Sequence, residues 1–79
     1  MKAILEFNMD EFDDVVAHKR AVKSLDVLLV LYDFDQHLRS ELKYNENLTD
    51  EQYEKLDKTR EKLYEIMNER NVSLDELLN

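Results

Sequence analysis

The sequence contains no cysteine, glycine, proline or tryptophan, and each absence excludes a class of structure or site. Without cysteine there is no disulfide framework, no cysteine zinc ligand and no thiol nucleophile. Without glycine, neither of the phosphate-binding motifs GxGxxG and GxxxxGK[ST] can be written. Positive charge is also scarce, with 11 Lys and Arg against 19 Asp and Glu and a net charge of -8. Because affinity for nucleic acid depends on cations that contact phosphates, we expect no direct binding of DNA or RNA.

Long apolar runs are missing as well. The longest, from Val27 to Tyr32, is far shorter than the roughly 18 residues that cross a bilayer. The apolar opening is interrupted at Glu6 before the core of a secretory signal could form. We therefore expect a soluble cytoplasmic protein without membrane contact. At 79 residues, 43% of them hydrophobic and 38% charged, residues 1–79 should form a single domain with a thin core.

Residues 1–8 have a pattern of their own. In an extended chain Ala3, Leu5 and Phe7 point to one side and Ile4 to the other, which predicts a short β-strand or arm. A single strand leaves its backbone groups unpaired, so it would have to pair with a second copy or with the sheet edge of a partner. The first turn of a helix or a frayed terminus is the alternative.

The next part of the chain reads as two helices. Asn8 with Glu11 matches a capping box, which predicts a helix over residues 9–20. We expect this helix to end or bend between His18 and Ser24, where several cations sit as they would at a helix C-terminus. Residues 21–44 then predict a long central helix.

The remaining chain predicts a third helix and a short final turn. A capping box that opens at Thr49 indicates a helix over residues 49–71, with Asn71 as its C-cap and Val72 making a hydrophobic contact back onto it. Another capping box opens a short terminal turn over residues 73–79. The expected fold is therefore mainly α, a helical hairpin or three-helix domain with a short N-terminal β-strand and a C-terminal helical turn.

The central helix carries more apolar surface than one contact uses. Its apolar residues form two adjacent stripes at helical spacing, Leu25, Leu28, Leu29 and Tyr32 in one and Val27, Leu31, Phe34, Leu38 and Leu42 in the other. The other helices of the same chain could cover both stripes. The competing interpretation, which we favour, is self-association as a homodimer or higher oligomer. The residues assigned to this contact are Ile4, Leu5, Val27, Val30, Leu31 and Phe34.

The acidic charge is concentrated in residues 46–79, which hold ten acids and five bases. A solvated helix face that keeps the protein soluble would account for this concentration. A surface that mimics phosphates and binds the nucleic-acid groove of another protein would account for it too. Tyrosines beside the acids are of the residue type that dominates interface energetics. The residues assigned to a protein-interaction face are Asp50, Glu51, Tyr53, Glu54, Asp57, Glu61 and Tyr64.

Signals for catalysis are weak. Asp33 and His37 are spaced i,i+4 and could share a metal ion or a proton, but an ordinary surface hydrogen bond explains the same spacing. The other histidine, His18, lies on a different segment, and no serine or threonine has the partners of a catalytic triad. We therefore expect no enzyme, no cofactor and no metal site.

Two segments resemble a group of small proteins from tailed phages. The opening MKAILEFN (residues 1–8) and the segment YDFDQHLRSELKY (residues 32–44) are similar to their MKAILEF start and their D-x-D-x-x-L-R-x-x-x-K-Y stretch before a final helix. The resemblance covers most of the chain, although residues 18–23 stand where the group often has a glycine-containing turn. It implies a phage origin, a non-structural early gene and a location in the bacterial cytoplasm.

The resemblance implies a kind of function rather than a reaction. Small acidic phage proteins without catalytic motifs commonly bind a host protein, so we expect a non-enzymatic protein that modulates a host factor in counter-defence or host takeover. One alternative is a homo-oligomeric structural or regulatory module with no host target. Another is a nucleotide-binding sponge at a subunit interface, which would use Lys19, Arg20, Lys23 or Arg39.

Overall fold

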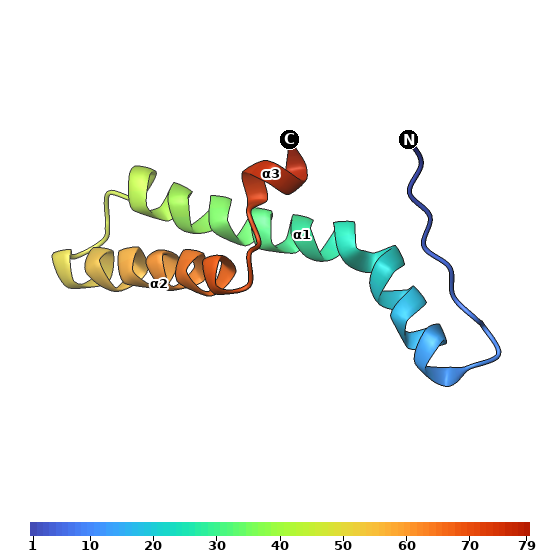
Figure 1. The fold of residues 1–79 in the computed structure, drawn as a ribbon. Coiled ribbons are helices and arrows are strands. Elements are labelled where there is room, and N and C mark those ends of the chain that lie inside the picture. Colours follow the sequence, from blue (N-terminus) through green and yellow to red (C-terminus); the bar gives the residue numbers. More distant parts are fainter.

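The computed structural model describes all 79 residues and contains three helices. Helix α1 spans Phe12–Tyr44, α2 spans Asp50–Glu69 and α3 spans Leu74–Leu78. Helices α1 and α2 form an antiparallel hairpin, and α3 lies on α1 (Figure 1). The expectation of a mainly α fold is confirmed. No helix combines the length and the apolar composition needed to cross a bilayer.

The predicted N-terminal strand is absent. Residues 1–8 are extended but belong to no sheet, and Ile4 is 84% exposed. Phe7 is half-buried, with its ring edge-on to that of His18 at 5.5 Å between centroids. A strand needs a second extended backbone to pair with, and this chain supplies none. Residues 1–8 therefore form an arm whose contact with α1 comes through a side chain rather than through backbone pairing.

Helix α1 begins later than the sequence pattern predicts. Its N-cap residue is Glu11, whose side chain makes no capping hydrogen bond, so the capping box expected between Asn8 and Glu11 is wrong. The Asn8 side-chain oxygen instead accepts a hydrogen bond from the backbone N–H of Asp10 at 3.1 Å. The backbone N–H of Asn8 in turn donates to the Asp14 carboxylate at 2.7 Å. Asn8 thus organises a turn ahead of the helix, as short polar side chains often do.

One helix stands where two were predicted over residues 9–20 and 21–44. Helix α1 has 33 residues, a length of about 50 Å at 1.5 Å per residue. The Ser24 hydroxyl donates to the Ala21 carbonyl at 2.8 Å, a bond that bends a helix without ending it. Figure 1 shows α1 bending in its N-terminal third, where the colour passes from blue to green. With no glycine or proline in the segment, nothing forces the helix to stop.

The start of α2 carries the signal that the sequence indicates, whereas its end comes earlier than predicted, at Glu69 with Arg70 rather than Asn71 as the C-cap. At the start, Thr49 and Gln52 exchange side-chain to backbone hydrogen bonds of 3.0 and 3.2 Å, a complete capping box. At the end, Asn71 has a left-handed φ of 56°, and the N–H of Val72 donates to the Met67 carbonyl at 2.9 Å. This is a Schellman motif, which turns the chain toward α3.

The core is small and the molecule is elongated. Only four residues are buried, Asp35, Leu38, Met67 and Leu74. The radius of gyration is 17.6 Å, against about 12 Å for a compact domain of this length. Figure 1 shows why: α2 runs beside the C-terminal part of α1, and the N-terminal third of α1 projects beyond it.

Candidate functional site

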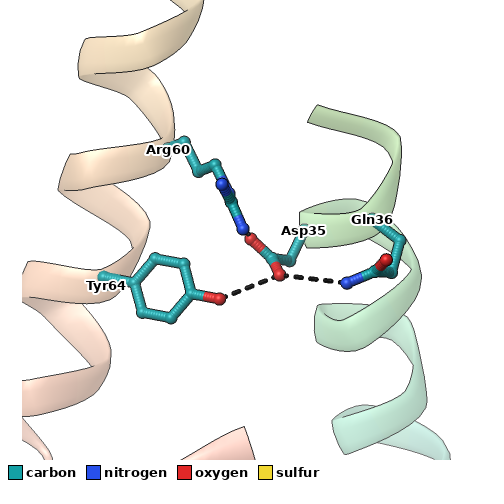
Figure 2. A network of polar contacts seen from close by, with 4 residues as sticks. All are labelled: Asp35, Gln36, Arg60 and Tyr64. Carbon is teal, nitrogen blue, oxygen red and sulfur yellow. Dashed lines mark hydrogen bonds and ion pairs between the residues drawn. The ribbon is translucent and has the colours of Figure 1, made fainter. Parts of the chain in front are cut away.

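The most buried polar group joins the two long helices. The Asp35 side chain on α1 is only 3% exposed and accepts a hydrogen bond from Arg60 Nε at 2.8 Å and another from the Tyr64 hydroxyl at 2.9 Å. Gln36 Nε2 adds a longer contact of 3.5 Å to the same carboxylate. Figure 2 shows Asp35 reaching from α1 toward Arg60 and Tyr64 on α2. We call these four residues the Asp35 cluster.

The helix geometry explains how two donors meet one carboxylate. Arg60 and Tyr64 are spaced i,i+4 on α2, so their side chains lie on the same face one turn apart. The Arg60 guanidinium also lies 5.6 Å from the centre of the Tyr64 ring, a favourable cation–π distance. Asp35 lies one turn before Leu38, so the carboxylate shares the α1 face that holds the apolar core. The cluster therefore fixes the register of α1 against α2.

The charges of the cluster are stabilised by their own contacts. Burial alone would raise the pKa of Asp35, but the hydrogen bonds from Arg60 and Tyr64 and the positive charge of Arg60 outweigh burial and hold it below its usual value. The hydrogen bond to Asp35 raises the pKa of Arg60. Burial, together with the hydrogen bond to Asp35, raises the pKa of Tyr64. The carboxylate stays ionised and the phenol stays protonated over the physiological range.

These shifts bear on what the cluster can do chemically. A general acid or base works best with a pKa near the operating pH. The shifts at Asp35 and Tyr64 move both groups away from neutrality, so neither is tuned for proton transfer. The arrangement is suited to holding two helices together, since a buried ion pair contributes more to specificity of packing than to net stability.

Sequence reasoning missed this cluster. Tyr64 is predicted to lie on the interaction face, whereas its hydroxyl donates to Asp35, and the sequence assigns neither Asp35 nor Arg60 to a site. A signal was present, because Arg60 interrupts the apolar positions of α2 between Leu56 and Leu63. Its partner could not be identified, because Asp35 lies 25 residues earlier, on another helix.

The residues of the predicted interaction face lie along α2. Asp57, Glu61 and Tyr64 line an open groove together with Arg60, Glu65, Asn68 and Glu69. We call its four carboxylates and Tyr64 the acidic groove. The other assigned residues, Asp50, Glu51, Tyr53 and Glu54, are exposed on the first turns of the same helix. The structure thus places the assigned acids on one helix and adds Glu65 and Glu69, which sequence reasoning left out.

The residues assigned to self-association fall into two groups. Val27, Val30 and Phe34 are exposed on α1, and Leu31 is half-buried beside them. Ile4 and Leu5 are exposed on the arm of residues 1–8. A groove runs between α1 and the chain around α3, and its apolar lining is Val27, Leu28, Leu31, Val72 and Leu77. We call this the apolar groove.

The structure separates the cations considered for nucleotide binding. Lys19, Arg20 and Lys23 line the apolar groove. Arg39 lines a different cavity, which it shares with Arg60 and with apolar side chains of α1 and α3. Four cations in two separate places do not form one phosphate site within the chain.

The geometry offers no cluster suited to a metal ion. No three His, Cys, Asp or Glu side chains come together in the arrangement that a metal needs. Asp33 and His37 are both exposed on α1, and no hydrogen bond joins them.

Comparison with known proteins adds no relative. A scan against protein-family models, a search of curated proteins and a search of solved structures each found no match.

Proposed function

We propose that the protein is a small, non-enzymatic binding protein of phage type, which attaches to a host protein in the bacterial cytoplasm and modulates it. The resemblance of residues 1–8 and 32–44 to tailed-phage proteins supports the phage origin. The binding role is carried by one observation: seventeen large hydrophobic residues are exposed while three are buried. Part of this apolar surface is contiguous, in the apolar groove, and a contiguous exposed patch is typical of a protein that binds another chain.

The accessible surface supports the same proposal. The chain exposes 7145 Å². The scaling relation for compact monomers gives roughly 5,050 Å² at 9.5 kDa, which leaves an excess of about 2,100 Å². A standard interface buries about 800 Å² on each partner, so the excess is large enough for more than one contact.

The acidic groove is the surface that we assign to the host protein. Asp57, Glu61, Glu65 and Glu69 follow one another at i,i+4 spacing, and each such like-charge pair destabilises a helix by a few tenths of a kcal/mol. Only Glu65 has an ion pair, a 3.2 Å contact with Lys62. A row of acids that weakens its own helix is better explained by a basic surface on a partner, such as a nucleic-acid-binding groove.

A binding comparison with two matched variants tests this proposal. The full chain is immobilised and exposed to a bacterial lysate at about 50 and 500 mM salt, and any captured protein is purified and rebound. The groove variant is Glu61→Gln with Glu69→Gln, neither of which forms an ion pair here. The control is Asp33→Asn with Glu46→Gln, which removes the same charge from exposed positions outside the groove.

The expected result is a host protein whose affinity falls about tenfold in the groove variant and less than twofold in the control. Its binding to the wild-type chain should also weaken strongly at the higher salt. Equal losses in the two variants would show that net charge alone matters. Absence of any purified partner that rebinds would overturn the assignment to a host protein.

The second candidate is a homo-oligomeric structural or regulatory module without a host target. The seventeen exposed hydrophobic residues favour it as much as they favour a host protein. Self-association of the chain, together with a lysate that yields no partner, would support this second candidate over the first.

The third candidate, a protein that binds nucleotides at a subunit interface, is less well supported, because Arg39 lies apart from the other three cations. A thermal-shift series with nucleotides tests it.

A further inference from the structure

The apolar groove has a positively charged rim. Lys19, Arg20 and Lys23 lie along α1 next to the apolar lining residues. Lys19 and Arg20 form no ion pair within the chain, and Lys23 has only an exposed 3.5 Å contact with Asp26. In a protein with a net charge of -8, three clustered cations around apolar side chains indicate an occupant that is both apolar and acidic.

The start of α1 has that chemistry. Phe12 is 80% exposed and Met9 is exposed next to it. Four carboxylates surround them, those of Asp10, Glu11, Asp13 and Asp14. This segment cannot reach the groove of its own chain, because α1 is continuous and separates Phe12 from Val27 by about 22 Å.

We propose that the occupant is a second copy of this chain, with the two α1 helices antiparallel about a two-fold axis near Val16 and Ala17. The first turn of each helix then lies against the cation-rimmed end of the other copy's apolar groove. This inference goes beyond the binding of a host protein, and it uses α1 rather than the acidic groove on α2.

The charges select the antiparallel arrangement. In this register Asp13 of one copy lies opposite Arg20 of the other, and the symmetry repeats this pair on the other side of the axis. Asp13 and Arg20 are seven positions apart and each lies three or four positions from Val16 and Ala17, so all four residues share one side of α1. A parallel pair would place each of these charges against its own equivalent and would be repelled.

The side-chain sizes fit the same register. Phe12 falls opposite Ala21, so the large side chain at the start of each helix meets a small one. Val16 falls opposite Ala17 at the axis, where small residues allow the helices to approach closely.

A charge-swap series tests both the association and its register. Mass is measured by light scattering on the full chain from about 5 to 200 µM, for the wild type, D13R, R20D and the D13R/R20D double variant. We expect a wild-type dimer, a dissociation constant at least tenfold weaker in each single variant, and recovery to within about threefold in the double variant, since the two-fold axis repeats each pair. The control E46R makes the same charge change as D13R in the α1–α2 loop and should leave the dimer unchanged.

A cross-linking measurement tests the same arrangement independently, in case the charge-swap variants do not fold. The chain has no cysteine, so Ala17→Cys introduces a single thiol close to the proposed axis, and Ser40→Cys introduces one far from it. Under mild oxidation Ala17→Cys should form a disulfide-linked dimer much faster than Ser40→Cys. A wild-type chain that stays monomeric up to 200 µM, a double variant as weak as the single ones, or equal cross-linking at the two positions would overturn the proposal. These outcomes leave the host-protein proposal standing, because they do not involve the acidic groove.

Discussion

Arg60 Nε donates to the Asp35 carboxylate at 2.8 Å and joins two helices across 25 residues of sequence. The bond lies in a protein with only four buried residues, of which Asp35 is the most deeply buried. A single polar contact therefore carries a larger share of the specificity of the hairpin than it would in a domain with a full core.

Removing the Asp35 carboxylate should destabilise the hairpin. The Asp35→Ala variant leaves Arg60 without its partner, and because Arg60 is partly exposed we expect a loss of about 2 kcal/mol, below the range for a fully buried pair. Urea denaturation followed by circular dichroism measures the change. Asp33→Ala, an exposed position two residues earlier, serves as the control and should lose less than about 0.5 kcal/mol.

Replacing the pair by apolar residues should have a different outcome. In Asp35→Leu with Arg60→Met no charge is left unpaired, so stability should stay within about 1 kcal/mol of the wild type or rise. The same urea titration measures it. A double variant as unstable as Asp35→Ala would show that the ion pair contributes net stability here.

Acid should weaken the protein through Asp35. Because its pKa is lower in the folded chain than in the unfolded chain, its contribution is fully present above the unfolded value, near 4, and is lost as the pH falls through the folded value. The unfolding free energy should therefore fall more steeply below about pH 4 in the wild type than in Asp35→Asn. Parallel curves for the two proteins would contradict the lowered pKa.

Alanine substitution should change the stability differently at two threonines, Thr49 at the N-cap of α2 and Thr59 within the helix. Thr49 caps the helix, so Thr49→Ala should lose about 1 kcal/mol. Thr59 lies within the helix, where its hydroxyl bonds to the Lys55 carbonyl, and alanine there should leave stability unchanged or raise it by a few tenths of a kcal/mol. Thermal unfolding compares the two, and equal effects would argue against the capping box.

The left-handed backbone at Asn71 gives a further prediction. Alanine at a φ of 56° meets a steric penalty that glycine avoids, so Asn71→Ala should lose about 1 kcal/mol and Asn71→Gly should lose little or none. The measurement is the midpoint of thermal unfolding. An alanine variant as stable as the glycine variant would mean that the turn after α2 can relax.

Sequence signals predicted those features that depend on neighbouring residues. The capping box at Thr49 and the backbone hydrogen bonds of the turn at Asn71 each join groups within five positions, so the start of α2 could be identified and its end placed to within two residues. The predicted start of α1 was wrong for a local reason, because the Asn8 side chain could form either a helix cap or a turn, and it forms the turn. The helix end expected between His18 and Ser24 does not occur, because no glycine or proline there forces one, and α1 bends instead.

Features that depend on distant partners could not be identified. The alternation in residues 1–8 indicates a strand, but the chain holds no second strand for it to join. Burial of Asp35 depends on Arg60 and on Tyr64, which lies 29 residues away, and no pattern around Asp35 reveals either donor. Some residues of the two apolar stripes make contacts within the chain and others line the apolar groove. Which residues do which depends on where α3 lies on α1.

The uninterrupted α1 has a consequence for how two binding surfaces would act together. No flexible linker separates the apolar groove from the hairpin that carries the acidic groove, so helical rise fixes their spacing. An antiparallel pair of chains would therefore present two acidic grooves at a set separation. A target with two basic sites at that separation would be held by avidity, since its second contact becomes intramolecular, whereas a target with one site would gain nothing.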